Sequence, residues 1–457
     1  MLEGLEISEV HLSDIDLGDR IDADYFTKEN IQIEKELKDH RSTELRNLAN
    51  FVASAFYPAA TQLYEIGDTP FIRCVDCINY PLITKSQDNI FENIPMSFVK
   101  DNKGISLLNK NDIVITKVGS PCFASLVYEH DVVALSRTVM GLKDIHGVNP
   151  FYLLAFLRSK FGLSQLMRAR ELTIQYQLTL ERVKRILVYL PSFDIQTTIE
   201  SVIKQSIEKQ IRSQALYTET EEFLLSELGL KDWQPKNENV SLKRLSDFAS
   251  SGRLDAEYYQ SKYDEIENVI KSYKGGYFFF GETIEYIFTG EYSEEYKSKA
   301  DDLIFYIRSL NIKNGTIEKD NSHYVSPAIF KKVVKTGNII TSRVGTIGVF
   351  AEVDKSLNNA ACSDNVLCFN LPNQYNPAVY TMLLNSKPIF ELVDRLARGS
   401  VQQRLNQETL KDLILPIIPE TTQSLIAEKI QKSFDLRKQS KLLLEQARRM
   451  VEEEIEK

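Results

Sequence analysis

The sequence has little cysteine and no long apolar run. Five cysteines in 457 residues, an odd number, favour a reducing compartment over a disulfide framework. Cys74 and Cys77 form the single CxxC pair, and with no second pair or HxxxH partner we expect small core residues and no metal. No apolar run reaches the roughly 18 residues of a membrane span, and the acidic N-terminus lacks the order of a signal peptide. These absences predict a cytoplasmic protein.

The net charge of −9 at first opposes nucleic-acid binding, but the charge is unevenly distributed. Residues 1–40 hold 4 basic and 12 acidic side chains, a net of −8. Residues 100–190 hold 13 basic and 7 acidic side chains, a net of +6, and residues 327–420 hold 10 and 8, a net of +2. A solvated surface explains such a bias equally well, so charge alone leaves the partner open.

The chain repeats itself. The segment 12–26, LSDIDLGDRIDADYF, aligns without a gap to 245–259, LSDFASSGRLDAEYY, with seven of fifteen positions identical. The offset of 233 residues exceeds the roughly 20–50 of solenoid units, so it indicates two homologous domains. Further marks recur in the same order: Phe71-Ile72-Arg73 with Tyr306-Ile307-Arg308, 115–120 with 341–346, Asn149-Pro150 with Asn376-Pro377, and Gln196 with Gln423. Between these marks the halves differ, which indicates a copied scaffold with specialised inserts.

Each repeat has a similar pattern of expected elements. Helices are expected over Ala23–Lys38 and Ala256–Lys271, and short strands at 70–75 and 304–309. Strands ending at a glycine turn are expected over 111–119 and 337–345. The Asn-Pro pairs open helices, with Asn as the cap and Pro at the first helical position. Polar loops follow at 170–177 and 398–404, and apolar strands close the repeats at 186–190 and 413–418.

Two long helices are expected last, from about Asp194 to Leu228 and from about Glu420 to the C-terminus. Each is about 50 Å long at 1.5 Å per residue, and a narrow apolar stripe requires a partner helix. The predicted fold is α+β: two homologous mixed α/β domains joined by two long antiparallel helices that form a coiled coil. The predicted boundaries are 1–193 and 233–419 for the domains, and 194–232 and 420–457 for the helices.

Asn149-Pro150-Phe151-Tyr152 resembles the Asn-Pro-Pro-Tyr element of adenine methyltransferases, but it lacks the second proline. The equivalent segment 376–379, NPAV, departs further. A helix start explains both. The sequence has no GxxxxGK[ST] phosphate loop and no glycine-rich turn of the kind that holds S-adenosylmethionine, so we predict that the chain is not an enzyme.

Four segments carry a family resemblance: 253–259, RLDAEYY; 306–315, YIRSLNIKNG; 337–348, GNIITSRVGTIG; and 414–426 with its PETTQ run. Their order, followed by a long helix and repeated more weakly in the first half, resembles the specificity subunit of Type I restriction–modification systems. The resemblance implies two target-recognition domains on double-stranded DNA. It also implies that the helices set the spacer and dock two methyltransferase subunits, which would bind S-adenosylmethionine, with motor-nuclease subunits joining for cleavage.

DNA contact requires Lys, Arg, amide or hydroxyl groups on exposed loops. The repeated loops offer these candidates: Arg73, Lys117, Ser120, Arg308, Arg343, Thr346, Arg398 and Gln402. Each could instead serve as a surface ion-pair or turn residue. The divergent stretches 78–110 and 311–335 are expected to hold the sequence-reading residues, and Tyr57, Tyr80, Tyr292 and Tyr324 could pack on sugars or bases. Partner subunits are expected on the helix faces near Ile203, Ile207, Ile430 and Phe434.

The sequence therefore predicts a non-catalytic subunit that reads a bipartite, asymmetric DNA site. Two alternatives stay open. The same two-headed plan could belong to a DNA-binding scaffold of another methylation or phage-defence system. It could also belong to a protein-only adaptor in which the coiled coil joins two binding modules. The salt dependence of DNA affinity separates the adaptor from the other two.

Overall fold

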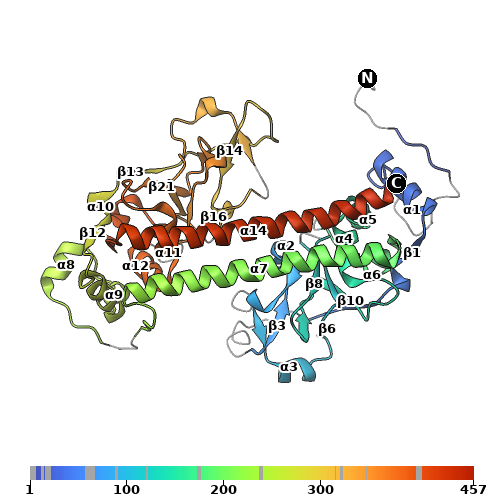
Figure 1. Cartoon of the computed structure of the whole chain (residues 1–457), viewed down its shortest axis with the longest axis horizontal. Coiled ribbons are helices and arrows are strands. Elements are labelled where there is room, and N and C mark those ends of the chain that lie inside the picture. Colours follow the sequence, from blue (N-terminus) through green and yellow to red (C-terminus); the bar gives the residue numbers. More distant parts are fainter. Residues whose placement is uncertain are drawn as a thin grey trace. The chain divides into compact units, whose positions relative to one another are not determined.

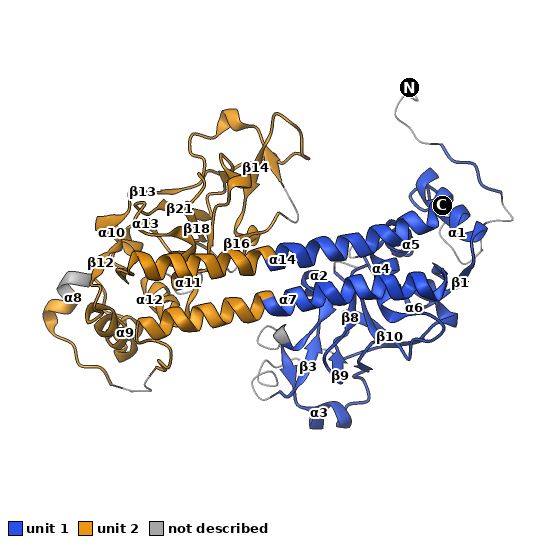
Figure 2. Cartoon of the chain, in the orientation of Figure 1, with its two compact units in different colours: residues 1–212, 436–457 blue, residues 213–435 orange. Residues whose placement is uncertain are grey.

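A computed structural model of the chain describes residues 7–11, 15, 22–56, 67–87, 91–119, 122–171, 176–235, 240–313, 315–319, 323–345, 347–397 and 404–457 (Figure 1). The chain forms two compact units. Unit 1 comprises residues 1–212 and 436–457, and unit 2 comprises residues 213–435 (Figure 2). Each of the two long helices therefore contributes one part to each unit.

Unit 1 is a mixed α/β domain with a four- and a five-stranded sheet. Its helices are α1 Lys28–Asp39, α2 Cys74–Asn79, α3 Met96–Asp101, α4 Pro150–Arg158, α5 Lys160–Arg168, α6 Leu180–Lys184 and the first part of α7 Phe193–Glu227. Its strands are β1 Ser42–Glu44, β2 Asn50–Ala53, β3 Thr69–Ile72, β4 Leu82–Ile83, β5 Asn93–Ile94, β6 Leu107–Asn109, β7 Ile113–Thr116, β8 Ala124–Val127, β9 Val132–Leu135, β10 Val139–Lys143 and β11 Leu187–Tyr189. The larger sheet has the order β2-β10-β7-β8-β4, the other β5-β3-β9-β6, and β1 pairs with β11.

Unit 2 has a similar inventory. Its helices are α8 Leu245–Ser251, α9 Ser261–Lys271, α10 Phe280–Thr283, α11 Pro377–Asn385, α12 Lys387–Leu396, α13 Gln407–Leu410, the second part of α7 and the first part of α14 Glu420–Ile455. Its strands are β12 Tyr277–Phe279, β13 Tyr286–Thr289, β14 Ile304–Ile307, β15 Ile312–Lys313, β16 Thr316–Ile317, β17 Tyr324–Val325, β18 Ile339–Ser342, β19 Phe350–Glu352, β20 Ala361–Cys362, β21 Val366–Asn370 and β22 Ile414–Pro416. The sheets have the orders β13-β21-β18-β19 and β17-β14-β20, with the further pairs β12-β22 and β15-β16.

The two units share their strand topology. The antiparallel order β2-β10-β7-β8 in unit 1 corresponds to β13-β21-β18-β19 in unit 2. Met140 of β10 faces Ile115 of β7 in unit 1, and Leu367 of β21 faces Thr341 of β18 in unit 2. In both units one parallel pair lies in the smaller sheet, β3 with β9 and β14 with β20. The duplication read from the sequence is therefore a duplication of fold.

The long helices α7 and α14 pack together, antiparallel, within each unit (Figure 2). In unit 1 the Ser206 hydroxyl donates to the Ser440 carbonyl at 2.9 Å, and Lys209 donates to Gln439 at 2.8 Å. In unit 2 the Ser213 hydroxyl donates to the Ser433 carbonyl at 2.8 Å, and Ser433 returns the bond at 2.8 Å. Small serines allow such close helix approach. The predicted fold class, with its antiparallel helix pair, is confirmed.

Several expected element boundaries are corrected. The helix expected from Ala23 begins only at Lys28, because the Thr27 hydroxyl caps it by accepting from the Asn30 N–H at 3.2 Å. The helix expected over Ala256–Lys271 divides into the 3-10 turn Ala256–Tyr259 and α9. The strand expected at 70–75 ends at Ile72, because α2 follows immediately.

The cysteines are free thiols, with Cys77, Cys122, Cys362 and Cys368 buried and Cys74 half-buried. Burial raises the pKa of the Cys122 and Cys362 thiols to about 12, so both stay protonated and act as small core side chains. Among the described helices, none is long and apolar enough to cross a membrane.

Candidate nucleic-acid interface

The repeated Asn-Pro pairs are helix starts. The Asn149 side-chain oxygen accepts from the backbone N–H groups of Phe151 and Tyr152 at 2.9 and 3.4 Å, and its amide donates to Glu200 at 2.5 Å. Asn376 caps α11 in the same way. Because these contacts occupy both ends of the Asn149 amide, its geometry fits a cap rather than a group that holds a substrate amine.

The repeated glutamines explain why the Asn-Pro starts are fixed. The buried Gln423 accepts from the Asn376 backbone N–H at 2.6 Å and donates to the carbonyls of Gln374 and Ile418 at 3.0 and 2.8 Å. In unit 1 Gln196 accepts from the Asn149 N–H at 2.8 Å. Each glutamine sits in the first turns of a long helix, so it joins that helix to the globular part of its unit.

The tyrosine of the first repeated segment stacks on an arginine in both units. The Arg168 guanidinium lies 3.9 Å from the Tyr25 ring centre and pairs with Glu34 at 2.6 Å. In unit 2 the Arg395 guanidinium lies 4.3 Å from the Tyr258 ring and pairs with Glu267 at 2.7 Å. These contacts attach α1 to α5 in unit 1 and α9 to α12 in unit 2. The repetition of this segment therefore has a structural cause.

Thr138 brings two DNA-contact candidates together in unit 1. The Lys117 N–H donates to the Thr138 carbonyl at 3.0 Å, and the Cys74 N–H donates to the Thr138 hydroxyl at 3.1 Å. Arg73, directly before Cys74, caps α2 and forms ion pairs with Asp76 and Glu92 at 3.5 and 3.4 Å. Lys117 and Arg73 therefore flank one loop at the ends of β7 and β3.

Asn365 takes the equivalent place in unit 2. The Arg343 N–H donates to the Asn365 carbonyl at 3.0 Å, and the Ser309 hydroxyl donates to the same carbonyl at 3.2 Å. Arg308 lies directly before Ser309, and its backbone N–H donates to the side-chain oxygen of Asn311 at 2.9 Å. Asn365 therefore brings the second pair of candidates, Arg308 and Arg343, together as Thr138 does the first. The bond from the first loop differs, because in unit 1 a backbone N–H donates to the Thr138 hydroxyl and in unit 2 the Ser309 hydroxyl donates to the Asn365 carbonyl.

A second loop joins each site through a short backbone bridge. In unit 1 Val118 pairs with Gln177, and the Leu178 N–H donates to the Lys117 carbonyl at 2.8 Å. In unit 2 Val344 pairs with Arg404, and the Leu405 N–H donates to the Arg343 carbonyl at 3.0 Å. We define the strand-end sites by these residues: Arg73, Lys117, Thr138 and Gln177 in unit 1, and Arg308, Arg343, Asn365 and Arg404 in unit 2.

The other four candidates, Ser120, Thr346, Arg398 and Gln402, lie outside the described residues. Thr138, Asn365 and Arg404 were missed by the sequence reasoning. Thr138 and Asn365 occupy the same register, 227 residues apart, but differ in type, so a search for identical residues passes over them. Arg404 follows the predicted Gln402 by two residues in the same loop.

Lys117 and Arg343, one cation of each strand-end site, are partly desolvated. Burial lowers the pKa of the Lys117 ammonium, and no carboxylate in the described part of the chain pairs with it. Around Arg343, the residues Thr289, Asn406, Gln407, Glu408, Thr409 and Asp412 line a polar hollow of about 550 Å³. The Arg343 Nε is buried and has no hydrogen-bond partner among the described residues. A buried donor of this kind is satisfied when an acceptor enters the hollow.

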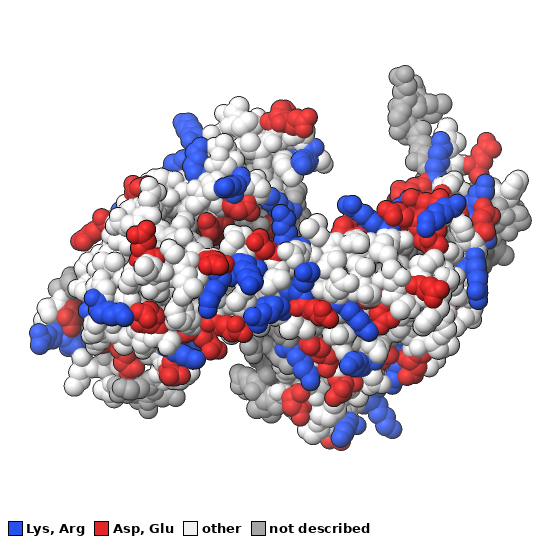
Figure 3. Space-filling view, viewed as in Figure 1, with Lys and Arg blue, Asp and Glu red and all other residues white. Residues whose placement is uncertain are grey.

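Basic and acidic side chains are interspersed over the visible face of each unit, with no large single-sign patch there (Figure 3). The tyrosines that were named as possible DNA contacts lie in different environments. Tyr292 is 67% exposed, Tyr324 lies half-buried in β17, and Tyr80 packs on Phe91 with ring centres 5.9 Å apart. Tyr57 lies outside the described residues.

The start of the divergent stretch 311–335 packs inward. Ile312 and Ile317 of the β15–β16 hairpin are buried in a small core. At the turn Gly315 has a left-handed φ of 78°, and an added Cβ there would lie 3.2 Å from the Phe434 ring and 3.3 Å from the Tyr217 hydroxyl. The hairpin thus contacts the helix pair within unit 2, which leaves the later residues of the stretch for any reading role.

The helix residues named for partner binding are used inside the units. Ile203 and Ile207 lie in the core of unit 1, Ile430 lies in that of unit 2, and Phe434 packs beside Ile430's cluster. A partner would therefore meet neighbouring exposed positions of the same helices, and partner binding there stays a prediction.

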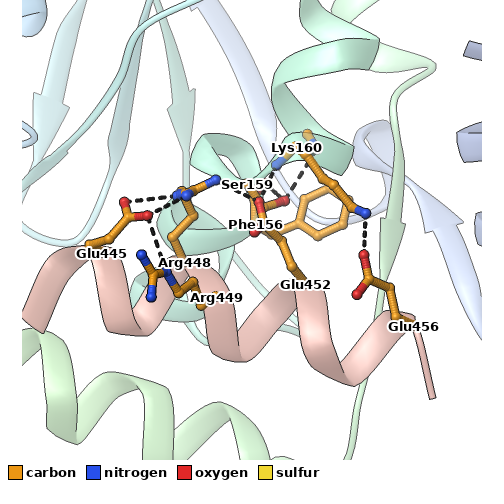
Figure 4. A network of polar contacts seen from close by, with 9 residues as sticks. Phe156, Ser159, Lys160, Glu445, Arg448, Arg449, Glu452 and Glu456 are labelled. Carbon is orange, nitrogen blue, oxygen red and sulfur yellow. Dashed lines mark hydrogen bonds and ion pairs between the residues drawn. The ribbon is translucent and has the colours of Figure 1, made fainter. Parts of the chain in front are cut away.

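The end of α14 contacts the start of α5 within unit 1 (Figure 4). The Glu452 carboxylate accepts from the Lys160 backbone N–H at 2.6 Å at the start of α5, and from Arg448 at 2.8 Å. The Lys160 ammonium pairs with Glu456.

Comparison with known proteins found a family model that matches part of the chain. Residues 261–446, which run from α9 into α14, match the family model of the Type I restriction modification DNA specificity domain. This segment is similar to a Type I DNA specificity domain. The resemblance inferred from the sequence motifs is thereby confirmed, and the strand-end site of unit 2 lies entirely within the specificity domain. The antiparallel order β2-β10-β7-β8 of unit 1 corresponds to β13-β21-β18-β19 in this segment.

Solved structures add slight likenesses over most of the chain. A Type I restriction–modification S subunit from M. genitalium is 9% identical, with 90% of this chain and 95% of that chain covered and a TM-score of 0.42. The HsdS subunit from Thermoanaerobacter tengcongensis is 12% identical, with the same coverage and a TM-score of 0.29. No curated protein matches the chain in sequence. The similarity to a Type I specificity domain therefore rests on residues 261–446.

Proposed function

We propose that this chain is the non-catalytic, sequence-reading subunit of a restriction–modification complex. Each unit would read one half of a bipartite, asymmetric DNA site through its strand-end site and the divergent loops around it. The helices α7 and α14 would set the separation of the half-sites and dock two methyltransferase subunits. The match of unit 2 to a DNA specificity domain carries this proposal.

The chemistry would reside in the partners. Methyltransferase subunits would bind S-adenosylmethionine and transfer its methyl group to adenine, and motor-nuclease subunits would cleave. This chain would place those subunits at the DNA site that it reads. Its duplicated framework with different surrounding side chains supports that role, because two unlike sites on like frames suit two unlike half-sites.

The salt dependence of DNA affinity tests the proposal against the protein-only adaptor. Neutralising six to ten phosphates weakens binding by about 10³- to 10⁵-fold between 50 and 200 mM salt. We expect a steep loss for the full chain, and a shallower slope for Lys117→Ala and for Arg343→Ala. If the full chain, with and without a methyltransferase partner, shows no salt-sensitive DNA affinity, the proposal is wrong.

A helix insertion tests the spacer role. The register joins Ser206 to Ser440 in unit 1 and Ser213 to Ser433 in unit 2, so an insertion in α7 alone would break one of these contacts. Four residues, about one turn, should therefore be added both after Gln210 and after Asp435. We expect the methylated site to gain spacer length while both half-site sequences stay the same. An altered half-site would contradict the assignment of reading to the units.

A further inference from the structure

The polar hollow of unit 2 contains an arginine whose backbone is fixed while its side chain is left with an unused donor. The Arg343 N–H donates to the Asn365 carbonyl at 3.0 Å, and the Arg343 carbonyl accepts from the Leu405 N–H at 3.0 Å. Its side chain is half-buried and lines the hollow, and its Nε is buried without a hydrogen-bond partner among the described residues. A donor in this state indicates an acceptor that comes from outside the chain.

Asp412 supplies the opposite charge to the same hollow. Neither Arg343 nor the exposed Asp412 forms an ion pair within the described part of the chain. The other carboxylate of the hollow, Glu408, pairs with Lys411 at 3.1 Å. A phosphate that approached Arg343 would also meet the negative charge of Asp412, whereas a neutral base edge can offer acceptors to the arginine and a donor to the aspartate.

The amide groups of the hollow already take part in hydrogen bonds. The Gln407 Nε2 donates to the Thr289 hydroxyl at 2.7 Å. The Asn406 side-chain oxygen accepts from the Thr409 N–H at 2.9 Å, at the start of α13. An adenine is recognised by an amide that donates and accepts at once, and each of these amides has one of the two groups engaged. The Arg343 guanidinium and the Asp412 carboxylate therefore suit recognition better than either amide.

Unit 1 has apolar side chains at positions equivalent to part of this lining. Ala53 of β2 and Thr289 of β13 are equivalent, because each faces the residue of the next strand that also pairs with β7 or β18. Leu180 and Gln407 are equivalent, because each lies two residues after the leucine whose N–H donates to the residue directly after β7 or β18. Ala53 and Leu180 pack against the core of unit 1. The polar lining therefore belongs to unit 2 and not to the shared framework.

An arginine and a carboxylate in one hollow match the major-groove edge of one G·C base pair. Guanine presents two acceptors, N7 and O6, to which a guanidinium donates two hydrogen bonds. Cytosine presents one donor, its N4 amino group, from which a carboxylate accepts. In an A·T pair the amino group of adenine stands where guanine has O6, and thymine presents the O4 acceptor, so both groups of the hollow would face a mismatched partner.

We propose that the polar hollow of unit 2 reads one G·C base pair of its half-site, with Arg343 donating to guanine and Asp412 accepting from the amino group of the paired cytosine. This inference rests on the proposed function. It makes these two side chains specificity-determining residues that act on a single position of the DNA. It leaves Arg404, on the loop that pairs with Val344, to contact phosphates.

Selection from a library of random-sequence duplexes tests the inference. The full chain, with and without a methyltransferase partner, is equilibrated with the library, and the bound duplexes are sequenced. We expect the bound sequences to share one G·C pair whose replacement by A·T weakens binding about 5- to 150-fold. In Arg343→Ala and in Asp412→Ala this preference should be lost at the same position, while every other position keeps its preference. Asp412→Ala should not weaken binding to duplexes without the G·C pair, because it removes a negative charge near the phosphates.

Arg404→Ala is the matched control, since it removes the same charge from the neighbouring loop but does not line the hollow. It should weaken binding to all duplexes by a similar factor and keep the G·C preference. The salt slope does not separate the two arginines, because a cation in the groove still lies within about 10 Å, one Debye length at 0.1 M salt, of phosphates. Arg343→Gln should move the preference towards adenine, and it replaces Arg343→Ala if the alanine variant does not fold.

The inference is wrong if the bound sequences share no such G·C pair. It is also wrong if Arg343→Ala weakens all duplexes alike, as expected of Arg404→Ala, or if Arg343→Ala and Asp412→Ala change the preference at different positions. These results would leave the proposed function standing, because the unaltered chain would still bind DNA. If the unaltered chain shows no DNA affinity, both are overturned.

Discussion

Replacing Gln423 by leucine tests whether the hydrogen bonds of this side chain join α14 to the globular part of unit 2. Gln423 is only 5% exposed and satisfies three backbone groups. The Gln374 carbonyl lies at the surface and can bond water instead, so two groups lose their partners: the Asn376 N–H and the Ile418 carbonyl. Each unsatisfied buried group costs about 1–3 kcal/mol. Leucine recovers part of this by burying apolar surface, so we expect a net loss of about 2 kcal/mol.

The assay is urea unfolding monitored separately in the two units by amide hydrogen exchange. We expect lower protection of α11 and the start of α14 in unit 2, with unit 1 unchanged. Gln431→Leu, an exposed position on the same helix, should change stability by less than about 0.5 kcal/mol. Gln423→Glu should destabilise at least as much as leucine at neutral pH, because a carboxylate cannot donate to the Ile418 carbonyl. If Gln423→Leu lowers the free energy of unfolding by no more than Gln431→Leu does, the hydrogen bonds of Gln423 do not stabilise the junction between α14 and unit 2.

Three further predictions concern stability. Arg395→Ala should destabilise unit 2 by about 2 kcal/mol, since it removes one of the two ion pairs of Glu267, whose other partner is Lys271, together with the stack on Tyr258. Arg395→Lys should recover only part of this loss in urea unfolding. Burial, and then the nearby carboxylate of Asp354, raises the pKa of Glu352 to about 7. Because the folded state holds this proton more tightly than the unfolded state, the free energy of unfolding should fall as pH rises from about 4.5 to 7. Glu352→Gln should make the urea midpoint less dependent on pH in this range. Glu452→Ala should cost unit 1 about 1–2 kcal/mol by uncapping Lys160 at the start of α5, and unchanged exchange of α5 would contradict this.

The sequence predicted the fold where local signals were strong. The Asn-Pro pairs predicted the starts of α4 and α11 to the residue, and the apolar stripes predicted both long helices within one or two residues. Early elements were less accurate. The 23–38 segment has helical periodicity, but a side-chain cap at Thr27 sets the true start, and such caps compete with propensity at every helix end.

The site was predicted in part, for a physical reason. Repetition located Lys117 and Arg343, whose backbones make the same hydrogen bonds in both units. It could not reveal Thr138 and Asn365, because each accepts the N–H of Lys117 or Arg343 through its backbone carbonyl, which any residue type supplies. Contacts that depend on the main chain leave little trace in the residue identities.

The same reasoning bears on which repeated residues touch DNA. Selection for a shared framework retains residues that hold the framework, and Gln196 with Gln423 is such a pair. A search for identical residues in two repeats therefore favours structural roles, as the ion pairs of the Arg73 side chain with Asp76 and Glu92 show. If the two units read different half-sites, the discriminating side chains must lie where the repeats differ on equivalent surfaces.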